Sequence, residues 1–193
     1  MTMTANGIDQ DRRTDFVKEM YRVYWANVAR SMDGTWKVVA PLTIVGTIVG
    51  AIHKEYLPAA LGLSFAFAIV FWALNVTIDL NAWHRRNLFF MTKAEQEFLL
   101  PEDYGRLLPA CYKTPPKGWI AFYIIHSVTF LAVIVFVILY GAAWKLPGTG
   151  FVRGWLLPLV VLLIGLTLTI INFVLQEKSA RRRFSELFGG QKA

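Results

Sequence analysis

Charge and cysteine are scarce in this 193-residue sequence. Only 17% of the residues are charged, and Cys111 is the single cysteine. One cysteine cannot form an internal disulfide, so the fold is not cross-linked in this way and requires no oxidising compartment. By contrast, 55% of the residues are hydrophobic and 15% are aromatic. This balance excludes an ordinary soluble domain and predicts a membrane protein.

The motifs of common enzymes are absent as well. The sequence contains no phosphate-binding GxxxxGK, no GxSxG, no HExxH and no pair of Cys or His at the spacing of metal ligands. We therefore expect no catalytic residues, no cofactor and no metal site. One alternative is a lipid-acting membrane enzyme that uses Asp79, His84 or His126 as acid or base.

Four apolar segments are long enough to cross a bilayer, which takes roughly 20 helical residues for about 30 Å of hydrocarbon. They are residues 36–52, 57–80, 119–144 and 152–175. Asp33 is expected to cap the first of these helices. The first 35 residues contain no apolar run typical of a signal peptide, so we expect the first span to be retained. The sequence predicts an all-α, polytopic membrane protein whose four spans pair as two hairpins.

Lysine and arginine are distributed unevenly between the segments that flank the spans. Residues 1–37 contain six, residues 81–118 contain six and the tail contains five, whereas the two remaining loops contain three in total. By the positive-inside rule, both termini and the middle loop are cytoplasmic, and we expect a multi-pass protein of the bacterial inner membrane. The net charge of +7 is then explained by loops and lipid headgroup contacts, so no direct binding of nucleic acid is expected.

This topology divides the chain into five parts. They are a cytoplasmic or interfacial helix (1–35), a first transmembrane hairpin (36–80), a cytoplasmic middle loop (81–118), a second hairpin (119–175) and a basic cytoplasmic tail (176–193). The second span is expected to continue as a helix to about Phe98, because Pro101 follows, and the tail is expected to extend the fourth helix. The proline-rich segment 101–118 is expected to pack on these cytoplasmic helices.

The N-terminal segment has apolar and aromatic residues at nearly helical spacing over residues 11–32. It predicts an amphipathic helix with basic residues on its polar face. Such a helix either lies on anionic headgroups or docks on the middle loop or on a neighbouring subunit. The sequence leaves both alternatives open.

Polar side chains recur at one depth inside the spans. Counted from Trp83, Trp119 and Lys178, three of them lie roughly 9 to 12 Å inside the cytoplasmic boundary. With the nearby aspartate, this polar intramembrane layer consists of Asn75, Asp79, His126 and Asn172. Buried polar groups in lipid either line a hydrated vestibule or pore, or form hydrogen bonds that fix the bundle. Asp79 alone is also expected to pair with Arg85 or Arg86.

Two further sets of residues are candidates for contacts between molecules. Basic residues at the cytoplasmic boundary are expected to contact anionic lipid headgroups or a partner. They are Arg85, Arg86, Arg181, Arg182 and Arg183. Gly46 and Gly50 form a GxxxG motif that allows close helix packing, either between copies of the chain or within it.

The layout resembles that of small bacterial transmembrane effectors associated with nucleotide-signalling and anti-phage systems. The resemblance rests on an aromatic and basic helix before the first span, YRVYWANVAR at residues 21–30, and on NAWHRRNLFF at residues 81–90, where a helix leaves the membrane. It implies a homo-oligomeric channel or pore-forming effector gated from the cytoplasm. The alternative is a non-catalytic membrane anchor or scaffold that recruits a soluble cytoplasmic protein.

Overall fold

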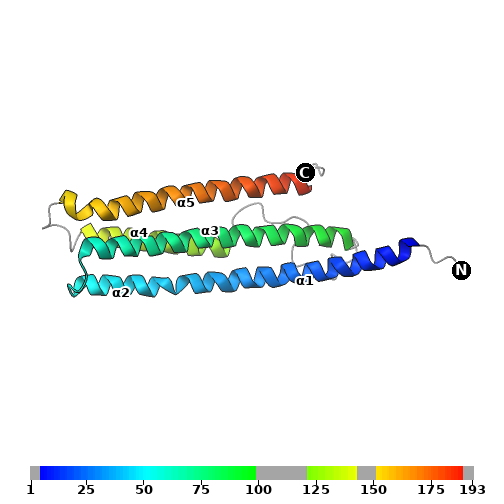
Figure 1. Cartoon of the computed structure of the whole chain (residues 1–193), viewed down its shortest axis with the longest axis horizontal. Coiled ribbons are helices and arrows are strands. Elements are labelled where there is room, and N and C mark those ends of the chain that lie inside the picture. The colour runs from blue at the N-terminus through cyan, green and yellow to red at the C-terminus, as the bar shows by residue number, and fades with distance from the viewer. Residues whose placement is uncertain (1–4, 99–120, 143–150, 189–193) are drawn as a thin grey trace.

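The structure is a computed structural model that describes residues 5–98, 121–142 and 151–188. Every element within these ranges is a helix: α1 (Ala5–Val39), α2 (Pro41–His53), α3 (Ala59–Phe98), α4 (Ala121–Tyr140) and α5 (Phe151–Phe188). The helices run along one axis, and α1 begins at the end where α5 finishes (Figure 1). We call this end the basic end, because most of the lysines and arginines lie there. The expected all-α class is confirmed.

Four helical segments are long and apolar enough to span a membrane. They are Thr14–His53, Ala59–Glu95, Phe122–Tyr140 and Trp155–Arg183. Each corresponds to one of the four expected spans. The chain therefore has the architecture of a multi-pass membrane protein.

The first span belongs to a longer helical run than the sequence predicted. Pro41 has no amide hydrogen to donate, so the helical ladder is interrupted between α1 and α2. The Thr43 amide donates to the Ala40 carbonyl at 3.0 Å, which carries the turn onward. The predicted cap at Asp33 is wrong, because α1 is already helical there and the carboxylate pairs with Lys37 one turn later at 2.7 Å.

A tight turn reverses the chain between α2 and α3. The Lys54 amide donates to the Gly50 carbonyl at 3.0 Å, and Glu55 adopts the left-handed conformation with φ of 63°. Ile52 then packs directly against Gly62 of α3. The first expected hairpin is therefore present.

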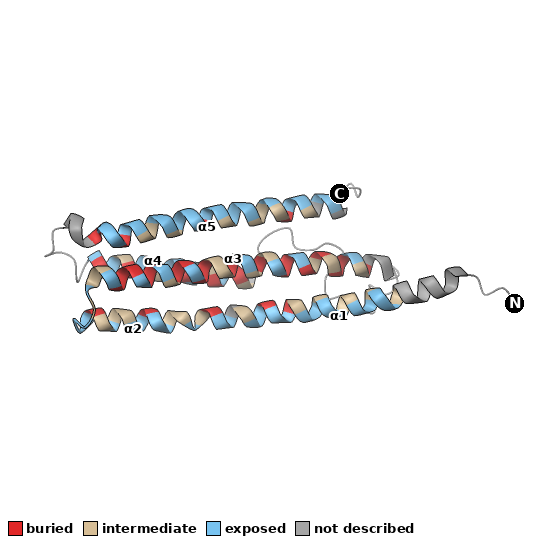
Figure 2. Cartoon of the chain, viewed as in Figure 1, coloured by how far each residue is buried: buried red, intermediate tan, exposed pale blue. Residues whose placement is uncertain are grey.

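The central helix of the bundle is α3. Helices α1, α2, α4 and α5 each pack against it, and within the described residues α4 and α5 are not packed along each other. Figure 2 shows that buried residues concentrate on α3. The core includes Leu63, Phe67, Val70, Phe71, Leu74, Phe130 and Ile134. The third and fourth spans follow each other in the sequence but do not pack as a hairpin, because each packs mainly against α3.

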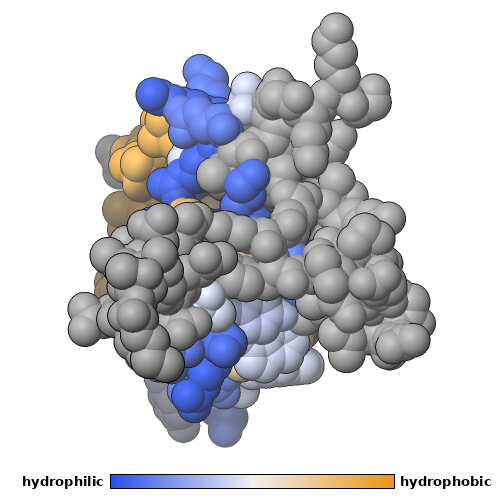
Figure 3. Space-filling view, turned by 90° about the vertical axis from the view of Figure 1, so that its right-hand side faces the viewer, coloured by the Kyte–Doolittle hydropathy of each residue, from blue (hydrophilic) through white to orange (hydrophobic). Residues whose placement is uncertain are grey.

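Helices α1, α3 and α5 continue beyond the apolar segments into the basic end. As predicted, α3 reaches Phe98 and α5 includes the tail to Phe188. Figure 3 looks onto this end, where the described atoms nearest the viewer are largely hydrophilic and hydrophobic atoms appear behind them. The boundaries expected at residues 35, 80 and 175 all fall within continuous helices. The predicted packing of residues 101–118 lies outside the described residues.

Candidate functional site

Polar side chains join α3 to α5 at the expected depth. Asn75 donates through Nδ2 to Thr169 Oγ1 at 2.8 Å and accepts from Asn172 Nδ2 at 3.1 Å. Asp79 Oδ1 accepts from the side-chain amides of Asn172 at 3.1 Å and Gln176 at 3.0 Å. We call these five residues the polar ladder. Their side chains hydrogen-bond to one another across two helices. This agrees with the second alternative for the polar intramembrane layer, in which hydrogen bonds fix the bundle.

His126 does not belong to this ladder. It is buried on α4, where Nδ1 lies 2.8 Å from the Phe122 carbonyl one turn earlier. A carbonyl only accepts, so Nδ1 carries the hydrogen. The ring also lies edge-on to Trp36 of α1 at 5.4 Å between centroids. The prediction of one layer that includes His126 is wrong, because counting residues gives depth but not the side of the bundle to which a side chain points.

A ring of α3 packed directly on a glycine of α5 lies next to the polar ladder. A Cβ at Gly165 of α5 would overlap the ring of Phe71 on α3, so only glycine allows this contact. Thr169 lies one turn further along α5 and donates back to the Gly165 carbonyl at 2.8 Å. The sequence analysis missed Gly165, whose signal is its position about two turns before the predicted Asn172.

Arg85 has a different role from the one predicted. Its side chain is only 4% exposed, and Nη1 lies 2.9 Å from Glu177 of α5. Arg181 reaches the other oxygen of the same carboxylate at 3.1 Å. The predicted pairing of Arg85 with Asp79 and its contact with lipid are therefore wrong, because α5 brings a carboxylate to the buried guanidinium from 92 residues away. The sequence analysis did not single out Glu177.

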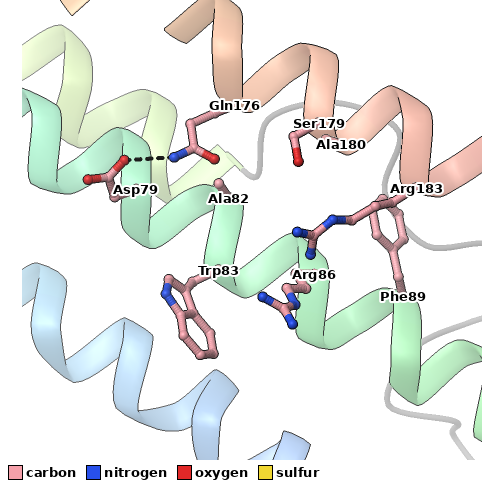
Figure 4. A pocket seen from close by; sticks show the side chains of 9 residues that line it. All are labelled: Asp79, Ala82, Trp83, Arg86, Phe89, Gln176, Ser179, Ala180 and Arg183. Carbon is pink, nitrogen blue, oxygen red and sulfur yellow. Dashed lines mark hydrogen bonds between the residues drawn. The ribbon is translucent and has the colours of Figure 1, made fainter. Parts of the chain in front are cut away.

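The other predicted basic residues divide into two groups. Arg182 is highly exposed and pairs with Glu186 on its own helix at 2.8 Å. Arg86 and Arg183 form no ion pair or hydrogen bond within the described ranges. Instead, both line a cavity of about 370 Å³ between α3 and α5. In Figure 4 the two guanidinium groups point into this space.

We call this space of about 370 Å³ the basic cavity, and it is polar where it meets the polar ladder. Besides the two arginines, it is lined by Asp79, Ala82, Trp83, Phe89, Gln176, Ser179 and Ala180. The Arg86 guanidinium carbon lies 5.7 Å from the centre of the Trp83 ring and 5.9 Å from that of Phe90, within range of cation–π attraction. These rings hold Arg86 over the cavity without neutralising its charge.

The basic part of α1 docks on the extension of α3. Tyr21 donates to Glu95 at 2.8 Å, and the rings of Tyr24 and Phe90 stack at 5.0 Å. Val28 is buried in the same contact. This is the second of the two predicted alternatives. Since α1 runs on into the first span-length segment, its axis follows that of the bundle.

A buried hydrogen-bonded group fastens α1 and α3 to α4. His84 Nδ1 lies 3.1 Å from both Ser31 Oγ and the Tyr123 hydroxyl. Ser31 also donates to the Val28 carbonyl at 2.7 Å. His84 thus joins three helices where the spans pass into the basic end. Within the described ranges, no group of three His, Cys, Asp or Glu residues is placed to hold a metal ion.

Gly46 and Gly50 make no close packing contact with the part of the chain that the structure describes. Both are exposed on α2, and a Cβ built on either would have no atom within 4 Å. The intramolecular alternative for this GxxxG motif is therefore wrong. Its face is open, so association between copies stays a prediction.

Comparison of the chain with protein-family models, curated proteins and solved structures gives no match. The resemblance to transmembrane effectors therefore stays a prediction from the sequence.

Proposed function

We propose that the protein is a multi-pass membrane scaffold that presents its basic end to a soluble cytoplasmic protein. The four apolar helices support the membrane placement. The excess of Lys and Arg at the basic end supports its cytoplasmic orientation. The polar ladder supports a structural role for the intramembrane polar groups, because its members are hydrogen-bonded to one another instead of lining a lumen.

The observation that carries this proposal is the exposure of large apolar side chains on the part of α1 that precedes the apolar run at residues 36–52, although the span-length helical segment itself begins at Thr14. Phe16 is 66% exposed and Trp25 is 51% exposed. Counted from Trp36 along the helix, they lie about 30 Å and about 16 Å beyond the start of the first span. Headgroup layers are only about 5 to 7 Å thick, so lipid does not cover these residues. A protein partner is the natural occupant.

The scaffold proposal is tested by site-specific photocrosslinking in cells. A photoreactive residue at position 16 or 25 is expected to give one discrete crosslinked protein in the membrane fraction. Position 156 on α5, where Leu156 is exposed among apolar residues, serves as the lipid-facing control. The identified partner should bind the purified chain stoichiometrically, and Phe16→Ser with Trp25→Ser should abolish that binding. Crosslinks shared with position 156, or binding unaffected by both substitutions, would count against the scaffold.

A second candidate is a homo-oligomeric channel or pore-forming effector, with the role in anti-phage defence that the resemblance implies. The open face at Gly46 and Gly50 favours self-association, which a lumen would require because one chain encloses none. The test is the mass of the detergent-solubilised protein together with ion flux in liposomes. Flux that Gly46→Leu and Gly50→Leu abolish together with the oligomer supports the channel. A silent monomer rejects it.

A further inference from the structure

Two cavities follow one another along the contact between α3 and α5, with the polar ladder between them, and we call the pair the furrow. Its apolar part is a groove of about 610 Å³, which on α3 is lined by Ala68, Phe71, Trp72 and Asn75. The basic cavity takes up the same helix face one turn later, at Asp79, Ala82, Trp83 and Arg86. On α5 the lining likewise passes from Leu168, Asn172 and Leu175 in the groove to Gln176, Ser179 and Arg183 in the cavity. Asn75 and Asp79 on α3, and Asn172 and Gln176 on α5, are each four residues apart, so each helix turns nearly the same face to both cavities.

The two ends of the furrow differ in chemistry. The groove is lined almost entirely by apolar side chains, and from Val161 to Leu175 it follows α5 for about 21 Å. One leaflet of the hydrocarbon core is about 15 Å deep, so the groove offers a full-length path for an acyl chain. The polar ladder lies at the junction, where the Asp79 carboxylate is already bonded to two amides.

Charge distinguishes the basic cavity from the rest of this boundary. Arg85 and Arg181 share Glu177, and Arg182 pairs with Glu186. Arg86 and Arg183 form no ion pair among the described residues, and both line the cavity, whose other end holds Asp79 (Figure 4). Two guanidinium groups offer planar, bidentate donors suited to a phosphate. A second copy of this face would instead bring like charges together.

We propose that the furrow binds one anionic phospholipid of the cytoplasmic leaflet. The phosphate lies between Arg86 and Arg183, and an acyl chain lies along the groove beside Trp72 and Leu168. Basic pockets between transmembrane helices bind anionic headgroups in this way. The proposal rests on the membrane placement argued above but not on the recruitment of a partner, so either can fail without the other.

The experiment is native mass spectrometry of the full-length protein in detergent, titrated with phosphatidylglycerol or phosphatidylcholine. Wild-type protein is expected to retain one phosphatidylglycerol and to prefer it over phosphatidylcholine. Because one basic residue near the surface contributes about 1 kcal/mol, Arg86→Gln and Arg183→Gln should each weaken retention about fivefold. The matched control is Arg182→Gln, which removes one positive charge from the position of α5 just before Arg183, where the side chain is exposed and pairs with Glu186. It should retain the lipid as wild type does.

A second variant separates a lipid from a free phosphate. Ala68 is exposed and lines the groove, so Ala68→Phe fills the acyl path without disturbing the core or the arginines. It should lower the retention of phosphatidylglycerol. Its binding of inorganic phosphate should be the same as that of the wild-type protein. Displacement of the lipid by inorganic phosphate, with no effect of Ala68→Phe, would assign the cavity to free phosphate and overturn the proposal. The proposal would also be overturned if Arg182→Gln weakened lipid retention as much as Arg86→Gln and Arg183→Gln do, or if both lipids were retained equally. A lipid-free dimer that buries the furrow would overturn it as well.

Discussion

Helices α3 and α5 are both long, apolar and able to span a membrane, but they are surrounded differently. In the most apolar part of α3, 61% of the residues are buried, compared with 6% in α5. Helix α3 has neighbours on several sides, whereas α5 is attached to α3 along one edge. Apolar composition suits contact with lipid and contact with other helices equally well. The attachment of α5 combines apolar packing of Trp155, Val161 and Leu162 on the core with three specific features, namely Gly165, the polar ladder and Glu177.

Truncating a core side chain of α3 should produce the largest contrast between the two helices. Phe67 is fully buried on α3, whereas Leu163 is 59% exposed on α5. Phe67→Ala should destabilise the protein by about 4 kcal/mol because it leaves a cavity. Leu163→Ala should cost less than about 0.5 kcal/mol. Equilibrium unfolding by SDS in mixed micelles, followed by circular dichroism, measures both changes. Similar costs would mean that the open face of α5 is covered by protein, as in an oligomer.

Removing the carboxylate that reaches Arg85 should weaken the attachment of α5 at the basic end. Glu177→Ala leaves the buried guanidinium without this partner, and breaking a buried ion pair from one side costs about 3 kcal/mol. Glu186→Ala on the same helix removes only an exposed pair with Arg182, worth about 0.3 to 0.5 kcal/mol. The same unfolding assay compares them. If the two variants behave alike, the pair between Arg85 and Glu177 does not fasten α5.

A larger side chain where Phe71 packs on Gly165 should also separate α5 from α3. Gly165→Leu forces a clash with Phe71, and overpacking of this kind costs about 2 kcal/mol. Gly46→Leu is the control, because a side chain there meets open space. Crosslinking between cysteines introduced at positions 72 and 168, which line the groove from the two helices outside the polar ladder, reports the separation directly in a Cys111→Ser background. Intact crosslinking in Gly165→Leu would show that the helices adjust without losing contact.

The sequence predicted the elements well because their signals are local. Apolar runs defined the four spans, and Pro101 indicated the end of α3 near Phe98. Equal depth also placed Asn75 beside Asn172, since both polar groups need a partner in hydrocarbon. Depth was sufficient there because α3 and α5 are neighbours.

The misplaced residues depend on which helices are neighbours, and no local signal contains that information. His126 lies at the same counted depth as Asn75 but packs against Trp36 of α1. Arg85 has aspartate nearby in sequence but pairs with Glu177 of α5. Periodicity gives the face of a helix relative to its own axis. It does not say which helix, or whether lipid, lies against that face.

The smallest effect expected here comes from the polar ladder itself. Asn172→Leu keeps the size of the side chain but removes the hydrogen bonds to Asn75 and Asp79. Hydrogen bonds between transmembrane helices contribute about 0.6 kcal/mol each, so the unfolding free energy should fall by about 1 kcal/mol. Thr129→Val is the control, because that hydroxyl bonds only to the Ile125 carbonyl of its own helix. If Asn172→Leu instead stabilises the protein, the ladder is present for a reason other than packing. In that case, a change of ion flux in liposomes caused by Asn172→Leu would indicate that the polar ladder has a role in conduction.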